Sequence, residues 1–362
     1  MIDNLTRAQQ FMLTACLASN KDDREKAVRL WEQEVVIDDL DFSSSRLIPY
    51  FYYRNQQDGI TSIHEKRIKI IYKHWWLRTQ HISHELTILH AALVEAGIAV
   101  VVIKGASIRS HYEQNVLRPM ADFDLLIHRS DLDQAVLVIE NLNYLANKSL
   151  QTNLKRRPGV FFDFVHAITC QHTGNGSQLD LHWRAGYWYS TAFTEALWRN
   201  TVPYKEIQNG KRPRLAYELF MIVVHAVESQ NRDNLNWIVD VALINKKADE
   251  SVWKEARDIA VQERKEGLFD YGCLLLRQFG LYAIEAGLAV RPRGILSTAP
   301  EQRAKMNFIE LISTRIGNMM YGVNLRFPHL NGVQKLGKVI KTIYYRFVLK
   351  FYIHNPNLRK SG

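Results

Sequence analysis

Acidic residues at three places in the chain could together hold divalent metal ions. Asp122 and Asp124 are separated by one apolar residue in ADFDLLI, and Asp180 lies in the later segment SQLDLHW. Side chains two residues apart on a strand point to the same face of the sheet, so the first two carboxylates should converge. Mg²⁺ and Mn²⁺ prefer oxygen ligands, and a pair of such ions can stabilise both the attacking and the leaving oxygen in phosphoryl or nucleotidyl transfer. The spacing predicts a carboxylate metal site, in which repulsion should raise at least one pKa when no metal is bound.

The same Asp-x-Asp spacing occurs twice more, in contexts that favour structural roles. Asp131 and Asp133 open DLDQAVLVIENLNY, whose apolar spacing is helical, so they suit the first turn of a helix. Asp39 and Asp41 precede a serine run in a polar stretch, where a solvated loop accounts for them. We therefore assign the metal site to the pair that has an acidic partner on a later strand.

The stretch Lys104-Gly105-Ala106-Ser107 directly follows the apolar run of AGIAVVVI. Such a run is typical of a buried strand, and the small residues after it favour a loop that could cradle phosphates. We expect the amides around Gly105 and the Ser107 hydroxyl to contact the β- and γ-phosphates, with a helix beginning in SIRSHYEQ. Lys104 either adds positive charge there or is a strand-end lysine in solvent.

Three polar residues near the acids have more than one interpretation. Arg118 precedes the acidic strand and could contact phosphate or pair with Asp122. His182 should share a strand face with Asp180, where it could contact nucleotide or orient the carboxylate. Asp180 itself could bind a second metal, act as general base toward an acceptor hydroxyl, or do both.

Four other residues could belong to a metal or nucleotide site. His166 and His172 share one face of a predicted strand, but no cysteine accompanies them, and we favour structural roles over a zinc site. His225 and Asp240 lie at helical positions in the C-terminal part, where an Asp–His pair would line the nucleotide cleft or tie two helices together.

At KGASI, LRPMADFDLLI and LDLHW the sequence resembles the nucleotidyltransferase superfamily that shares the DNA polymerase β-like catalytic fold. More narrowly it looks like a poorly characterised bacterial nucleotidyltransferase family often found beside biosynthetic gene clusters. It is also similar to the toxin-type nucleotidyltransferases of abortive-infection systems. The resemblance covers residues 90–190, and Ala106 stands where the usual loop has a second glycine or a serine.

The resemblance implies transfer of a nucleoside monophosphate from an NTP such as ATP, with Mg²⁺ or Mn²⁺ and release of pyrophosphate. Asp122, Asp124 and Asp180 would be the metal ligands. The acceptor stays open between a small molecule, a peptide, a protein and tRNA. The alternative is a non-catalytic module with the same fold that binds RNA, a membrane surface or a protein partner through a basic surface.

The order of sequence patterns predicts an α/β (α+β) protein in which a mixed sheet carries the site. We expect an N-terminal helical segment over residues 1–90, a catalytic core over 91–205 and a C-terminal helical domain over 206–362. The stretch 43–59, SSSRLIPYFYYRNQQDG, is expected to break the N-terminal helices. TGNGS at 173–177 predicts a hairpin that brings the third aspartate to the acidic pair.

Composition sets the remaining expectations. The chain has 362 residues of which 47% are hydrophobic, enough for a large core. Its three cysteines, Cys16, Cys170 and Cys273, have no C-x-x-C spacing, so a reducing cytoplasm fits, and neither an export signal nor a membrane-spanning run is expected. The net charge of +10 suits polyanionic partners. The basic, acid-free segment 335–360 predicts an amphipathic helix that either docks on the core or contacts tRNA or anionic lipid.

Overall fold

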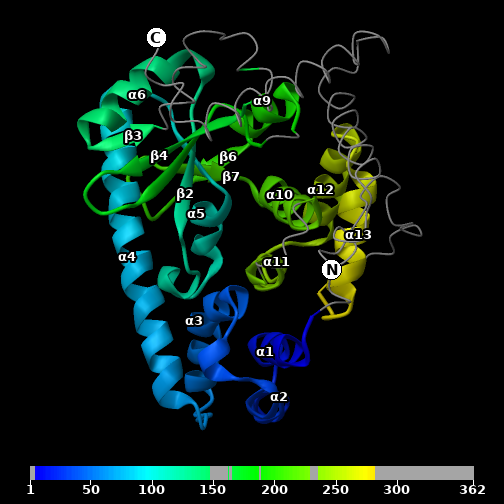
Figure 1. The fold of residues 1–362 in the computed structure, drawn as a ribbon. Helices are drawn as coiled ribbons and strands as arrows, with labels where there is room; N and C mark the ends of the chain where they lie inside the picture. The colour runs from blue at the N-terminus through cyan, green and yellow to red at the C-terminus, as the bar shows by residue number, and fades with distance from the viewer. Residues whose placement is uncertain (1–4, 147–161, 163–164, 187–188, 229–234, 282–362) are drawn as a thin grey trace, which may run out of the picture.

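The computed structural model describes residues 5–146, 162, 165–186, 189–228 and 235–281. A mixed five-stranded sheet lies between helices from both sides of the sequence (Figure 1). The strands are β1 (Val101–Ile103), β2 (Asp122–Leu126), β3 (Tyr144–Ala146), β4 (Ala167–His172) and β5 (Gln178–His182), with a separate pair β6 (Thr201–Pro203) and β7 (Lys211–Pro213). The helices are α1 (Arg7–Leu17), α2 (Lys21–Glu34), α3 (Phe42–Gln57), α4 (Glu65–Glu95), α5 (Lys104–Ile108), α6 (Leu132–Asn141), α9 (Thr191–Arg199), α10 (Leu215–Glu228), α11 (Asn236–Asn245), α12 (Glu250–Gln262) and α13 (Glu266–Arg277).

The strand order in the large sheet is β1-β2-β5-β4-β3. β2 and β5 run parallel, and the other neighbours are antiparallel. β4 and β5 form the hairpin predicted from residues 173–177. The predicted α/β architecture, a mixed sheet with helices on either side, is confirmed.

The two faces of the sheet are covered by different parts of the chain. Phe123 and Leu125 of β2 are fully buried in a core formed with α4 and α6. Burial of such side chains contributes about 1.5–3 kcal/mol each. Leu126 points to the opposite face and joins a second core with the N-terminal helices and α10 to α13. Asp124, two residues before Leu126, therefore lies on the face toward the C-terminal helices.

Residues 42–57 form α3, so the break predicted over 43–59 is wrong. Asp41 is the N-cap, and its carboxylate accepts a bond of 2.9 Å from the Ser44 amide, where a solvated loop was expected. Pro49 lies inside the helix and removes one backbone donor. The helix persists because its buried face, including Phe51, packs into the core.

Most other helical patterns are found where the sequence places them. The long pattern before residue 97 is α4, and α10, α11 and α12 follow in the C-terminal part. Asp131 is the N-cap residue of α6 and Asp133 lies in its first turn, which confirms their structural interpretation. Within the described ranges no helix combines the length and apolar character needed to cross a bilayer. The predicted amphipathic helix over 335–360 falls outside the described residues.

Candidate metal centre and active site

The acids predicted from the sequence come together on β2 and β5. Asp124 lies directly opposite Asp180 in the parallel pair, and Asp122 precedes it by two residues on the same face. Thr169 on β4 donates a hydrogen bond of 2.6 Å to Asp180 Oδ1 and fixes that carboxylate. One ligand atom each from Asp124, Asp180 and His182 lie within 4.8 Å of one another. Side chains from two adjacent strands thus form a compact group of potential metal ligands.

Lys104 points into this group. β1 ends at Ile103, which is paired with Asp124, so the next residue emerges beside the acids. Lys104 Nζ lies 2.6 Å from Asp124 Oδ1 and 3.3 Å from His182 Nε2. Burial alone would lower the pKa of Lys104, but the charge of Asp124 raises it and keeps the ammonium protonated. The interpretation as a lysine in solvent is wrong.

Lys104 also has an unusual backbone conformation. Its φ of 53° is in the left-handed region, which costs a non-glycine residue about 1–3 kcal/mol. α5 begins at this residue, without the longer loop that the sequence suggested and ahead of the predicted start in SIRSHYEQ. This strained residue is where β1 passes directly into α5, and Asp124 holds the Lys104 side chain.

His182 contacts the acid of the neighbouring strand. Its Nε2 lies 2.9 Å from Asp124 Oδ1, and its Nδ1 lies 3.2 Å from the carbonyl oxygen of Arg184. Burial, followed by the charge of Lys104, lowers the pKa of His182, so the imidazole is neutral at pH 7. His182 therefore contacts the carboxylate of Asp124, whereas the sequence suggested that it orients Asp180.

The three carboxylates differ in their electrostatics. Asp122 is exposed at the edge of the group, yet desolvation by surrounding atoms, and then the charges of Asp124 and Asp180, raise its pKa. Burial would also raise the pKa of Asp124, but Lys104 and His182 bring it well below the ordinary value. The raised pKa of Asp122 agrees with the expectation for clustered carboxylates, although desolvation contributes more to it than repulsion does.

Arg118 packs against the turn after β1, beside Gly105. Its Nε and Nη2 donate to the two carboxylate oxygens of Asp240, both at 2.8 Å, and the Tyr112 hydroxyl donates to the same carboxylate at 2.7 Å. A Cβ placed on Gly105 would lie 2.6 Å from Arg118 Nη1. Arg118 therefore pairs with Asp240 and not with Asp122. Asp240 ties α11 to the segment before β2, whereas the sequence suggested that it pairs with His225 and ties two helices together.

The Ser107 hydroxyl is engaged within the turn. The residue is fully buried, and its Oγ donates a hydrogen bond of 3.0 Å to the Lys104 carbonyl. This contact braces the turn that presents Lys104 and leaves the hydroxyl facing protein. A phosphate contact by the backbone amides around Gly105 stays a prediction.

Two arginines that sequence analysis missed hold the segment leading to the acidic strand. Arg46 of α3 donates to the Pro119 carbonyl at 3.1 Å, and Arg78 of α4 donates to the Ala121 carbonyl at 3.3 Å. Burial, and then the charge of Arg118, lower the pKa of Arg46 to about 10, although the charge of Asp122 opposes the shift. No pattern in the sequence links these helices to Asp122, because the link depends on tertiary packing.

Histidines from two directions lie near the group. The rings of His166 and His182 are 5.3 Å apart, since β4 and β5 pair immediately beyond His166. Burial and the charge of Lys104 lower the pKa of His225 on α10, so this residue lies within electrostatic range of the site. His172 accepts bonds from the amides of the hairpin turn, a structural role.

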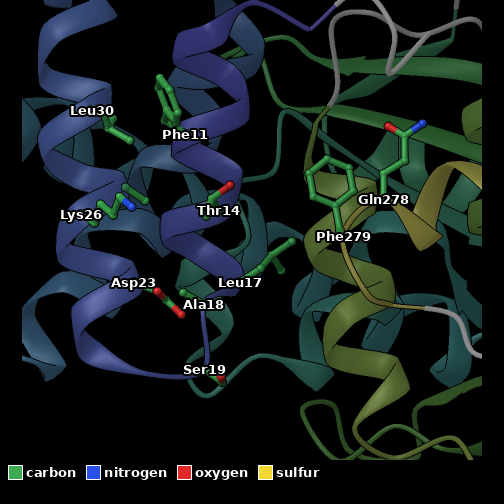
Figure 2. Close-up of a pocket in the computed structure, with 11 residues that line it drawn as sticks. Phe11, Thr14, Leu17, Ala18, Ser19, Asp23, Lys26, Leu30, Gln278 and Phe279 are labelled. Carbon is green, nitrogen blue, oxygen red and sulfur yellow. The ribbon is translucent and has the colours of Figure 1, made fainter.

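A pocket of about 530 Å³ lies elsewhere, between α1, α2 and the end of α13 (Figure 2). Phe11, Leu17, Leu30 and Phe279 contribute apolar walls, and Lys26 contributes a cation. Figure 1 places these helices apart from the sheet that carries the acids. The pocket is therefore separate from the carboxylate group.

The mixed five-stranded sheet with helices on both sides agrees with the fold of a nucleotidyltransferase. The chain belongs to the family of uncharacterised nucleotidyltransferases, whose sequence pattern matches residues 42–280. No curated protein matches it. The family match extends past the range 90–190 on both sides and crosses the predicted domain boundaries after residues 90 and 205, so that division stays a prediction.

Proposed function

We propose that the protein transfers a nucleoside monophosphate from a Mg²⁺-bound NTP to an acceptor hydroxyl and releases pyrophosphate. The observation that carries this proposal is the direct pairing of Asp124 with Asp180 on parallel strands, with Asp122 on the same face. Membership of a nucleotidyltransferase family supports the reaction class.

The donor set fits a hard divalent cation. Asp122, Asp124 and Asp180 offer carboxylate oxygens, the ligands that Mg²⁺ and Mn²⁺ prefer. When bound, the ion would offset charge on the triphosphate and on the attacking and leaving oxygens. His182 would orient Asp124 as a hydrogen-bonded partner behind it, an arrangement that commonly tunes metal-binding carboxylates.

Each protein group then has a defined task in the transfer. The acceptor oxygen forms a bond to the α-phosphorus while the bond from that phosphorus to the oxygen bridging to the β-phosphate breaks. Asp180 would take the acceptor proton through the carboxylate oxygen that does not accept the hydrogen bond from Thr169. Lys104, released from Asp124 when the ion binds, would add positive charge beside the phosphates. Pyrophosphate leaves with the electron pair of the broken bond.

The direct test follows label from α-phosphate-labelled NTP and the release of pyrophosphate, with Mg²⁺ and with a chelator. Asp124→Asn should abolish metal-dependent pyrophosphate release. Asp131→Asn/Asp133→Asn is the control, because it changes another Asp-x-Asp pair, at the start of α6, and it should release pyrophosphate as wild type does. Nucleotide binding without release, unchanged in Asp124→Asn, would support the non-catalytic alternative.

A further inference from the structure

The outward surface of α4 carries a line of exposed aliphatic side chains. Ile63, just before the helix, Ile70 and Leu77 are 75%, 60% and 59% exposed. Residues seven apart lie two turns apart on nearly the same side of a helix, so Ile70 and Leu77 share one side of α4. Ile63 precedes the helix at the same spacing, and we call the three residues the ridge. Figure 1 shows α4 along one edge of the molecule.

This ridge is separate from the face that holds α4 in the fold. The helix buries a different stripe in the core, which comprises Ile68, Trp75, Thr79, Ile82, Leu86, Leu89, His90 and Leu93. The buried stripe packs in the core, whereas Ile70 and Leu77 lie on the exposed side of the helix. Exposed apolar patches on a protein surface commonly mark interaction sites.

Cations lie among and beside these aliphatic residues, and Lys66 and Lys73 alternate with them along the helix. Residues 66–84 contain no aspartate or glutamate, and the exposed positions include Lys66, Arg67, Lys69 and Lys73. Two acids outside this range reach the face, where Asp38 pairs with Arg67 and Glu65 pairs with Lys69, both at 3.1 Å. The surface formed by Ile63, Ile70, Leu77 and these four cations, which we call the outer face of α4, keeps an excess of positive charge.

We propose that the outer face of α4 binds an anionic lipid surface. A helix whose aliphatic ridge is bordered by lysine and arginine can insert the ridge at the headgroup boundary while the cations meet lipid phosphates. Each lysine or arginine near such a surface contributes about 1 kcal/mol. This proposal is independent of the catalytic one, since none of the three aspartates takes part.

Charge and composition favour lipid over the other partners. RNA phosphates would attract Lys66 and Lys73 but offer little contact to aliphatic side chains at the centre of the face. A second copy joined through the same face would bring like charges together. An anionic bilayer satisfies both the ridge and its borders.

Flotation of the full chain with vesicles tests the proposal. The protein should float with vesicles that contain phosphatidylglycerol and stay behind with vesicles of phosphatidylcholine alone. Ile70→Ser/Leu77→Ser should weaken partitioning by about tenfold or more through lost apolar burial. Lys66→Gln/Lys73→Gln should weaken it by about fivefold per lysine.

Matched variants elsewhere serve as controls. Leu137, 64% exposed on α6, and Lys254, exposed on α12, supply substitutions of the same type away from the face. Leu137→Ser and Lys254→Gln should float as wild type does. Because all substituted residues are exposed, thermal melting should show intact folding in each variant.

A second readout reports contact with lipid directly. A polarity-sensitive fluorophore on Ile70→Cys should shift to the blue with phosphatidylglycerol vesicles, and one on Leu137→Cys should not. Burial raises the pKa of Cys16 and Cys170 to about 12, which slows labelling at those native thiols. Absence of flotation by wild type overturns the proposal. So does RNA binding that depends on the two lysines without flotation, or self-association that Ile70→Ser/Leu77→Ser abolishes.

Discussion

Replacement of Lys104 by methionine removes the positive charge of the side chain but keeps most of its apolar length. The ammonium is 2.6 Å from Asp124 Oδ1, and the two side chains are 31% and 9% exposed. Loss of one partner costs 0–1 kcal/mol for an exposed pair and about 3–5 kcal/mol for a buried pair. The intermediate burial of this pair leads us to expect a loss of about 2 kcal/mol at neutral pH.

Thermal melting with and without Mg²⁺ measures this effect. Unfolding entropy of about 2.1 cal/mol/K per residue amounts to about 0.76 kcal/mol/K for 362 residues, so the Tm should fall by about 3 °C. Mg²⁺ should stabilise Lys104→Met more than it stabilises wild type, because in the variant Mg²⁺ does not compete with the Lys104 ammonium for Asp124. Lys254→Met on α12 is the control and should leave the Tm unchanged.

The pKa of Asp124 provides a second readout of the same variant. Without Lys104, burial of Asp124 is opposed only by His182, so its pKa should rise. Carboxyl carbon resonances followed by NMR across acidic pH would report this change. A Lys104→Met protein as stable as wild type, with an unchanged Asp124 pKa and no added response to Mg²⁺, would refute the contact.

Four further outcomes follow from the structure. Asp240→Asn leaves the buried Arg118 guanidinium without its counter-charge, so denaturation should show a loss of about 3–5 kcal/mol, and unchanged stability would contradict the pairing. Gly105→Ala forces a Cβ against the same guanidinium and should cost about 1–3 kcal/mol in that assay, whereas a neutral effect would mean that the turn can relax. The raised pKa of Asp122 means that this group protonates at a higher pH than an ordinary aspartate, so Mg²⁺ affinity should begin to fall there as the pH is lowered. Asp180→Asn removes one repelling charge and should lower the pKa of Asp122 in an NMR titration, which an unchanged value would contradict.

Local patterns were sufficient to predict the strands that carry the acids and the hairpin beside them, but not the edge strand β3. Alternation along β2 and β5, with glycine and asparagine in the turn before Gln178, predicts the strands and the hairpin that join Asp124 to Asp180. The break expected over 43–59 failed because proline and a serine run favour turns locally, whereas the buried face of α3 makes the helix favourable in the folded protein.

Contacts between distant segments were beyond local patterns. Lys104 could be placed at the end of a strand, but its pairing with Asp124 depends on the antiparallel register of β1 and β2. The bond from Arg118 to Asp240 joins residues 122 positions apart. Arg46 likewise reaches the acidic strand only through packing of α3, so none of these contacts could be inferred from spacing.

Calorimetric titration of Mg²⁺·NTP tests the assignment of the metal site most directly. Wild type and Asp131→Ala/Asp133→Ala should bind at least one NTP in a metal-dependent manner, and Asp122→Ala/Asp124→Ala should lose that binding. The control has the same two changes at the same spacing, placed at the start of α6 and outside the sheet. Equal metal-dependent binding by all three proteins, or by none of them, would contradict the assignment of the NTP site to the paired strands β2 and β5.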